Sequence, residues 1–460
     1  MSRTSNMSLH FVYSPGYSEI TSGNGHILFH TNRSRWVVVN DTGLEIADHL
    51  AKGIIPDDVA SIIASRYALT LERALSDVSY IHDHLKTNHF LDISGDSVVG
   101  RVPRLDSLYL HLTRRCNLSC LQCYYRTSDA DTRTDLPTAR IFTMIDELTA
   151  HGGKSITLSG GEPLLHPDIR KILTYCAPKL TVRLLTNGTM IDREWASFLS
   201  SMNIFVQISI DGSTREIHDT IRSPGSFDKS LRAIALLQDA GLGHRLNLCT
   251  TVMNTNLHDL RNIISLCERL GVPQVRFLPL RNVGAARRHW DAIGAGLTTA
   301  DYEQFYDITE DLRSSKEVSV DVSCGLSGFM LKVPEEFSDD DIWCPIGRQL
   351  VVDTNGDAFP CVLMMREEFM LGSVHHDALL DITRSRKMDE LCGALSERRS
   401  KIEKCASCTW RNLCQAGCMG QALDHTNTIW ETDDFCNYRQ HLYQRAFDKI
   451  LGTDSRRLPE

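Results

Sequence analysis

The region from residue 107 to about residue 280 alternates between two hydrophobic patterns. Short apolar runs with the two-residue period of strands are separated by longer runs that repeat every three to four residues, as helices do. Alternating strands and helices predict a parallel sheet with helices outside it. Six such units predict an α/β fold, a partial (β/α)6 barrel whose site lies at the carboxyl ends of its strands. The expected strands are Ser107–Leu112, Ser155–Leu158, Thr181–Leu185, Ile204–Ile210, Arg245–Val252 and Gln274–Leu278, with helical patterns such as Thr138–His151, Ser226–Ala240 and Leu257–Leu270.

Residues 1–95 have a different pattern and predict a separate small domain. It begins with three short runs typical of strands and continues with three helical patterns. Residue types that carry catalysis are not concentrated here, so a binding module is expected. Glycine, serine and proline then predict a linker over 96–106, and the core domain follows over 107–315. The expected elements are strands Leu9–Ser14, His26–His30 and Arg35–Asn40, and helices Leu44–Ala51, Pro56–Arg66 and Thr70–Leu85.

The C-terminal third predicts a third domain over 316–440. Two apolar strands, Gln349–Val352 and Ala358–Val362, flank the turn residues Asn355-Gly356-Asp357 and predict a hairpin. Residues 441–460 follow as a C-terminal helix and tail: the helical pattern covers 437–451, and Asp454–Glu460 are expected to fray.

Composition excludes several classes of protein. The net charge is −9 and no long basic run occurs, which argues against a nucleic-acid surface. No apolar run approaches the ~20 residues that cross a bilayer, and residues 1–7 lack the apolar segment of a secretory signal. The chain has 15 cysteines, which without a signal indicate reduced thiols and metal. We therefore expect the cytoplasm, with little oxygen.

Three of these cysteines follow the first expected strand of the core. Cys116, Cys120 and Cys123 form a C-x3-C-x2-C triplet on one short loop. Three thiolates can hold three irons of a cubane cluster, which leaves one iron open for chemistry. A zinc site would need a fourth ligand, and the nearest candidate, His111, sits inside the expected strand.

This triplet resembles the cluster loop of the radical SAM superfamily, whose open iron binds the amino and carboxylate groups of S-adenosylmethionine. Ser159-Gly-Gly-Glu-Pro163 resembles the family motif that engages the cofactor's ammonium. Gln122 departs from the family, which usually has an aromatic residue or histidine there, and we expect Arg222 to face the cavity. The resemblance implies cofactor contacts from Gly160, Gly161, Glu162, Asn187, Ser209, Val275 and Phe277.

Seven further cysteines lie in the C-terminal third, at spacings that match the SPASM extension of that superfamily. The resemblance implies two auxiliary 4Fe–4S clusters, and three clusters in all. Cys324 is the best candidate for a fourth ligand of the first auxiliary cluster; alternatively that cluster keeps an open iron for a substrate thiolate. Two zinc ribbons are the rival interpretation. The implied ligands are Cys344, Cys361 and Cys418 for the first cluster, and Cys405, Cys408, Cys414 and Cys436 for the second.

Residues 1–95 resemble the peptide-recognition domain of ribosomal-peptide biosynthesis, a winged-helix-like α+β module similar to the peptide chaperone of pyrroloquinoline quinone synthesis. The resemblance lies in the order of its elements and in Val37-Val-Val-Asn-Asp-Thr-Gly43. In that family a leader peptide adds a strand to the sheet edge. A plain packing domain is the alternative.

Together these resemblances imply a radical SAM oxidoreductase that modifies a ribosomally made precursor peptide, with an electron donor such as flavodoxin or ferredoxin. We predict intrapeptide thioether formation, as in sactipeptide and ranthipeptide synthases. Other peptide chemistries stay open: carbon–carbon or carbon–oxygen cross-linking, epimerisation and decarboxylation. A sulfatase-type maturase is disfavoured because Val362, and not aspartate, follows Cys361. A non-catalytic electron carrier is disfavoured by the intact Gly160-Gly161-Glu162. The sequence assigns no general base.

Overall fold

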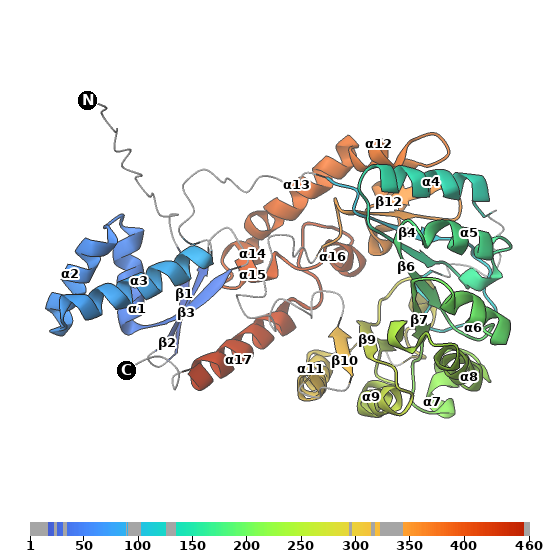
Figure 1. Cartoon of the computed structure of the whole chain (residues 1–460), viewed down its shortest axis with the longest axis horizontal. Coiled ribbons are helices and arrows are strands. Elements are labelled where there is room, and N and C mark those ends of the chain that lie inside the picture. Colours follow the sequence, from blue (N-terminus) through green and yellow to red (C-terminus); the bar gives the residue numbers. More distant parts are fainter. Residues whose placement is uncertain are drawn as a thin grey trace.

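The computed structural model describes residues 17–22, 25–30, 35–88, 90, 103–125, 135–293, 297–313, 318–322 and 344–454. Figure 1 shows a small N-terminal domain at one end of the molecule and a large α/β domain at the other, with helices of the C-terminal third between them. The expected strand Leu9–Ser14, most of the expected linker, Cys324 and the tail after Asp454 lie outside the described residues.

The N-terminal domain combines a three-stranded antiparallel sheet with three helices. All three expected helices and two of the expected strands are present. The pattern does not predict β1, because Tyr-Ser-Glu-Ile-Thr-Ser has no apolar run; this strand is defined by its pairing with β2. The sheet order is β1-β2-β3, and the elements are β1 (Tyr17–Ser22), β2 (Gly25–His30), β3 (Trp36–Asn40), α1 (Asp41–Ala51), α2 (Pro56–Tyr67) and α3 (Leu71–Thr87).

One face of this sheet packs against the helices. Leu28, Val37 and Val39 share a buried cluster with apolar residues of all three helices. The chain turns directly from β3 into α1, where the side chain of Asn40 accepts a hydrogen bond from the backbone N–H of Gly43 at 2.8 Å. This cap satisfies a backbone donor that has no partner within the helix, so the helix starts at a defined residue.

The large domain is built on a ten-stranded sheet in the order β10-β9-β8-β7-β6-β5-β4-β11-β12-β13. The six expected parallel strands form its centre, so the predicted α/β class is confirmed. Additional strands extend both edges: β10 pairs with β9, and β11 pairs with β4, each in parallel. The strands are β4 (Ser107–His111), β5 (Ser155–Ser159), β6 (Thr181–Thr186), β7 (Ile204–Ser209), β8 (Leu246–Val252), β9 (Gln274–Pro279), β10 (Ser319–Val322), β11 (Gln349–Val352), β12 (Asp357–Phe359) and β13 (Gly372–Ser373).

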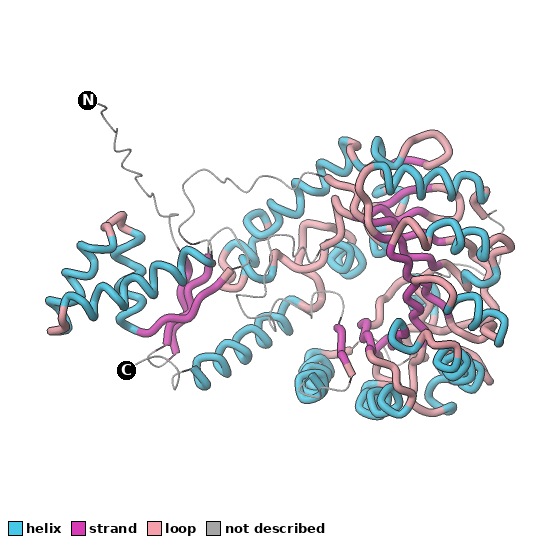
Figure 2. Tube along the Cα trace, viewed as in Figure 1, coloured by secondary structure: helices cyan, strands magenta, loops and turns pink. Residues whose placement is uncertain are grey.

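Helices lie along the outer side of the central strands, as Figure 2 shows. Alternate residues of each strand, such as Leu108, Leu110 and Val206, are fully buried in the main apolar core. The intervening residues face the inner side of the curved sheet, so polar groups gather there. The helices are α4 (Thr138–Ala150), α5 (Ile169–Cys176), α6 (Arg193–Ser200), α7 (Arg215–Ile221), α8 (Ser226–Asp239), α9 (Leu260–Arg269), α10 (Gly284–Arg288) and α11 (Thr299–Arg313).

The C-terminal segment adds the expected hairpin and a set of helices. β11 and β12 pair antiparallel around Gly356, whose φ of +86° suits glycine at this turn. The expected closing helix is present as α17. None of the described helices is long and apolar enough to cross a membrane. The helices of this segment are α12 (Leu379–Thr383), α13 (Arg386–Lys401), α14 (Glu403–Ala406), α15 (Arg411–Cys414), α16 (Met419–Thr426) and α17 (Cys436–Asp454).

Candidate functional site

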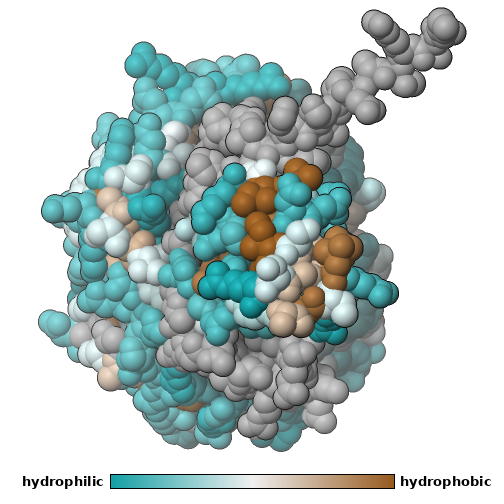
Figure 3. Space-filling model, turned by 90° about the vertical axis from the view of Figure 1, so that its left-hand side faces the viewer, coloured by the Kyte–Doolittle hydropathy of each residue, from teal (hydrophilic) through white to brown (hydrophobic). Residues whose placement is uncertain are grey.

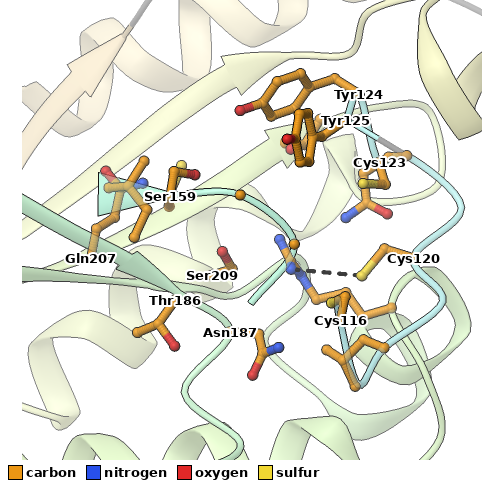
Figure 4. Close-up of a pocket in the computed structure, with 18 of the residues that line it drawn as sticks. Cys116, Cys120, Cys123, Tyr124, Tyr125, Ser159, Thr186, Asn187, Gln207 and Ser209 are labelled. Carbon is orange, nitrogen blue, oxygen red and sulfur yellow. Dashed lines mark hydrogen bonds between the residues drawn. The ribbon is translucent and has the colours of Figure 1, made fainter. Parts of the chain in front are cut away.

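The loop after β4 forms one wall of a cavity of about 460 Å³. Cys116, Cys120 and Cys123 all line this cavity, and Figure 4 shows them along the loop that faces the strand ends. Cys116 is exposed and the other two are half-buried. Burial raises the pKa of the Cys120 thiol to about 12. The structure thus brings the three predicted iron ligands to one open cavity.

The two glycines of the Ser159–Pro163 motif lie directly against this loop. A Cβ on Gly160 would lie 2.5 Å from the carbonyl oxygen of Thr113, and one on Gly161 would lie 2.3 Å from that of Arg115. The Gly161 N–H donates to the Thr113 carbonyl at 2.7 Å. Glycine is required here because any side chain would push the loop away. Both glycines line the cavity, as the resemblance implies.

Glu162 is fully buried and lies behind the lining of the cavity. Its carboxylate accepts hydrogen bonds from the Thr186 hydroxyl at 2.7 Å and from the Asn187 backbone N–H at 2.8 Å. Burial raises the pKa of Glu162, although these hydrogen bonds act in the opposite direction. Glu162 therefore positions Asn187, which lines the cavity and donates from Nδ2 to Asn117 at 2.9 Å.

The expected cofactor contacts on β7 and β9 differ in where the structure places them. Ser209, at the end of β7, lines the cavity. Val275 and Phe277 are fully buried in the main core, on the face of β9 where Phe277 makes an edge contact with Phe305. Leu278 lines the cavity instead. The expectation for Val275 and Phe277 is corrected by the strand's alternation, which directs successive side chains to opposite faces.

A network of charged and polar side chains packs against the cysteine loop. Asp211 is fully buried and forms an ion pair with Arg222, whose Nε lies 2.6 Å from Oδ2. The same oxygen accepts a hydrogen bond from Gln122 Nε2 at 2.5 Å, and Oδ1 accepts one from the Thr251 N–H at 2.7 Å. Arg222 Nη1 lies 3.9 Å from Cys120 Sγ. Gln122 thus contributes to the network that holds the Arg222 guanidinium beside Cys120.

Sequence reasoning missed an aromatic wall of the cavity. Tyr124 and Tyr125 follow Cys123 directly and line the cavity. Tyr125 is sandwiched between the ring of His111, stacked at 4.0 Å, and the guanidinium of Arg114 at 4.6 Å. Tyr124 is hydrogen-bonded to His111 Nε2 at 3.0 Å, and burial lowers the pKa of His111 to about 4. His111 is therefore a neutral packing residue.

Apart from Ser209, sequence reasoning also missed the side chains that the inner face of the sheet presents to the cavity. The signal was their two-residue spacing at the ends of strands that otherwise look purely apolar. Cys249 belongs to this group. The inner-face residues that line the cavity are Tyr109, Ser159, Leu185, Gln207, Ser209, Cys249, Thr251 and Leu278.

A second cavity, of about 540 Å³, shares a wall with the first. Arg114, Tyr124 and Tyr125 line both of them. The opposite side of the second cavity is formed by residues that follow Cys361, among them Val362 and Leu363. The wall is fixed by Asp353 next to the hairpin turn, which pairs with Arg114 at 2.5 Å and accepts a hydrogen bond from the Tyr125 hydroxyl. The cavity therefore lies between the two cysteine-bearing parts of the chain.

The described C-terminal cysteines gather into two sets. Burial raises the pKa of the Cys361 thiol well above the usual value, and the neighbouring thiols of Cys418 and Cys344 raise it further. A separate small cavity has polar side chains beside its thiols: Arg439 Nε donates to Cys414 Sγ at 3.3 Å and Gln440 Nε2 to Cys408 Sγ at 3.5 Å. That cavity is lined by Cys405, Cys408, Cys414 and Cys436.

The donor chemistry of these sets suits iron–sulfur clusters. Within the part of the chain that the structure describes, no group of His, Cys, Asp or Glu converges on a single metal ion. A cubane spreads its cysteine ligands around its corners, whereas a tetrahedral zinc needs four donors around one point. The thiolates of both sets are the ligands that iron–sulfur clusters take.

Comparison with known proteins agrees with this donor chemistry. Residues 110–267 match the radical SAM superfamily, and residues 344–409 match SPASM, an iron–sulfur cluster-binding domain. Mycofactocin maturase MftC of Mycolicibacterium smegmatis is 30% identical over 311 residues, which cover 67% of this chain and 76% of the relative. Fe-coproporphyrin III synthase of Methanosarcina barkeri is 27% identical over 352 residues, covering 71% and 86%.

A solved structure has a similar fold over most of this chain. Streptococcus suis SuiB bound to S-adenosylmethionine has a TM-score of 0.60 at 17% sequence identity and covers 92% of this chain and 99% of its own. Fold and site together define an enzyme that uses an iron–sulfur cluster and S-adenosylmethionine. The chain belongs to the radical SAM superfamily and carries a SPASM domain.

Proposed function

We propose that this radical SAM enzyme modifies a ribosomally made precursor peptide. The observation that carries the proposal is the N-terminal domain, a three-stranded sheet with three helices joined to a radical SAM core and a SPASM domain. The relative at 30% identity is a maturase, and SuiB, which also matches this chain in complex with its precursor peptide SuiA, is similar over 92% of the chain. These likenesses support a peptide substrate.

The N-terminal domain would bind the leader of that peptide. Its sheet has two edge strands, β1 and β3, and an edge strand can pair with an added peptide strand. Most of the large apolar side chains that the described residues expose belong to this domain, and Figure 3 shows apolar side chains on its outer face. Exposed apolar groups in one region mark a binding surface. They are Ile55, Ile62, Tyr67, Leu69, Leu71 and Tyr80.

Cys116, Cys120 and Cys123 would hold the cluster that binds S-adenosylmethionine. When bound, these two groups would supply radical chemistry that removes a hydrogen atom from a substrate carbon. The protein's residues have simpler tasks. Gly160 and Gly161 admit the cofactor close to the backbone, and polar groups at the strand ends orient it. The two tyrosines of the aromatic wall line both cavities, so the second cavity would hold a segment of the peptide next to the reacting carbon.

The C-terminal cysteines would hold two auxiliary 4Fe–4S clusters, for a total of three. Cys344, Cys361 and Cys418 serve the first, with Cys324 as its fourth ligand. Cys405, Cys408, Cys414 and Cys436, the second cysteine set, would hold the second auxiliary cluster. Such clusters can take up the electron that remains when a new bond closes, and a flavodoxin or ferredoxin would supply the enzyme's reducing electrons. The position of Cys361 beside the second cavity supports this division of roles.

Among peptide modifications, we propose a thioether between a cysteine sulfur and a carbon. The test is anaerobic: the reconstituted enzyme, S-adenosylmethionine, a reductant and the peptide encoded beside its gene are incubated and the peptide is analysed by tandem mass spectrometry. Loss of two hydrogens per cysteine, with those thiols no longer alkylatable, is the expected result. The same loss with free thiols would replace thioether formation by another cross-link. Release of 5′-deoxyadenosine with no change in peptide mass, and no deuterium uptake in heavy water, would contradict the peptide-modifying function.

A further inference from the structure

The N-terminal sheet has a second apolar face, turned away from its own helices. Because side chains alternate along a strand, Ile27, Phe29 and Trp36 lie on the face opposite Leu28 and Val37. All three of the former are buried, with exposed fractions of 0%, 1% and 5%. Figure 1 shows that this sheet lies beside α15 and α17 of the C-terminal segment. The second face is therefore covered by another part of the chain.

Aromatic rings form the contact between the two parts. Phe29 lies 5.7 Å from Trp410 and 5.2 Å from Phe447, both edge to face. Trp36 meets Phe447 in the same way at 5.1 Å, and Trp410 stacks on Phe447 at 5.5 Å with the planes 7° apart. Rings packed at these distances and angles bury large apolar areas and attract one another. The N-terminal domain is thus anchored to the C-terminal segment by a buried aromatic layer.

The same aromatic layer forms a wall of the second cysteine set. Trp410 and Tyr443 line the small cavity of Cys405, Cys408, Cys414 and Cys436. Cys408 and Cys414 pack against the cluster of apolar residues that contains Phe29 and Trp36.

Helix α17 joins the two features. It presents Cys436, Gln440, Tyr443 and Phe447 at spacings of four, three and four residues, which place them on one helix face. Cys436, at the start of this helix face, lines the small cavity of the second cysteine set. Phe447, near its end, packs on the N-terminal sheet.

We propose that the N-terminal domain has a second function: its sheet is the outer cover of the second cysteine set and excludes water and oxygen from the cluster bound there. The inference rests on the proposed assignment of those cysteines as ligands of a 4Fe–4S cluster. Solvent exposure changes the reduction potential of such clusters, so the cover affects the cluster's redox behaviour as well as its lifetime. The domain that would bind the leader is then also part of a cluster site.

The experiment compares cluster loss in the reconstituted full-length enzyme and in cover variants. Phe29→Ala and Trp36→Ala remove rings from the aromatic layer, and Trp36→Phe is a milder change. Phe205→Ala is the matched control, because that ring is 42% exposed and lies on β7 of the large domain. On exposure to air, the visible absorbance and iron content of the two alanine variants should fall severalfold faster than in the wild type, with a fast phase of about one third of the iron, since each cubane holds about four irons. Trp36→Phe should lie between, and the control should match the wild type.

Cys408→Ala identifies which iron is lost. It should lower the starting iron content by about a third and remove the fast phase when combined with Phe29→Ala. If Phe29→Ala and Trp36→Ala lose iron at the wild-type rate while Cys408→Ala lowers iron content, the cover is wrong and the cluster assignment stands. If Cys408→Ala leaves iron content unchanged, the assignment itself fails and the inference fails with it. Limited proteolysis of Trp36→Phe checks that the N-terminal domain is still folded.

Discussion

At the scale of single residues, Asp211 and Arg222 illustrate how a buried pair supports the site. Asp211 is completely buried, and burial raises its pKa even though Arg222 acts to lower it. The guanidinium in turn lies beside Cys120. Removing one member of a buried ion pair leaves the other as an uncompensated charge, which costs far more than the pair contributes as a whole. The pair therefore links the stability of the core to the geometry of the cysteine loop.

Replacing Arg222 with glutamine should destabilise the protein by about 3–5 kcal/mol, the usual cost of breaking a buried pair. The double variant with Asp211→Asn should recover part of this loss, because no charge then remains unpaired. Anaerobic denaturant unfolding measures both effects. A double variant that is as unstable as the sum of its single changes would contradict the pairing.

A second prediction concerns pH. His218 is fully buried, and burial lowers its pKa from 6.5 to about 3. In the unfolded chain the imidazole takes up a proton near pH 6.5, whereas the folded chain resists protonation until far lower pH. Stability is therefore lost as pH falls below about 6.5, and the loss continues toward pH 3.

Between about pH 7.5 and about pH 5.5, His218 should cost the wild type about 1.4 kcal/mol of stability. A His218→Gln variant should lack this part of the pH dependence, whatever its stability at neutral pH. Unfolding measured at both pH values gives the difference. An unchanged pH dependence in the variant would show that another group is responsible.

At the scale of elements, the turn after β5 and the loop after β4 form one unit. Gly161 donates to Thr113, and the next backbone N–H donates to Arg115 at 2.8 Å. The two segments approach so closely that only glycine fits at positions 160 and 161. The motif thus sets the position of the cysteine loop.

Gly161→Ala should displace the cysteine loop, because the new Cβ would lie 2.3 Å from the Arg115 carbonyl oxygen. We expect loss of about four irons per chain and of S-adenosylmethionine cleavage, while the auxiliary clusters remain. Iron analysis and electron paramagnetic resonance distinguish the clusters. Gly393→Ala is the control, since a Cβ there meets no atom within 4 Å. Retention of the full iron content in Gly161→Ala would contradict the conclusion that this glycine sets the position of the cysteine loop.

At the scale of the whole molecule, the three parts of the chain share surfaces. The sheet of the large domain continues into the hairpin of the C-terminal segment, and that segment packs against the N-terminal sheet. Deleting residues 1–95 would therefore uncover the second cysteine set as well as removing the proposed leader-binding surface. Point changes on the outer face of the domain are the cleaner test of leader binding.

Leu71→Asp and Ile62→Asp should weaken binding of the precursor peptide and slow its turnover by tenfold or more if each costs about 1.4 kcal/mol of binding. Cleavage of S-adenosylmethionine without peptide should not change, because both residues lie in the N-terminal domain. Phe205→Asp is the matched control: Phe205 is 42% exposed, comparable to Ile62 at 36%, but lies on β7. Equal loss of peptide turnover in the control would remove the N-terminal surface from consideration.

The sequence by itself determined the parallel sheet, the helices around it and the chemistry of the cysteine loop. These follow from local patterns: alternation predicts strands, three-to-four spacing predicts helices, and soft thiolates at short spacing predict iron. The tertiary structure alone decided which strand face meets the cavity, so Leu278 lines it and Val275 and Phe277 do not. Only folding brings Gln122, Asp211 and Arg222 together, or sets Phe29 against Trp410, because these contacts join residues far apart in the chain and no local pattern records them.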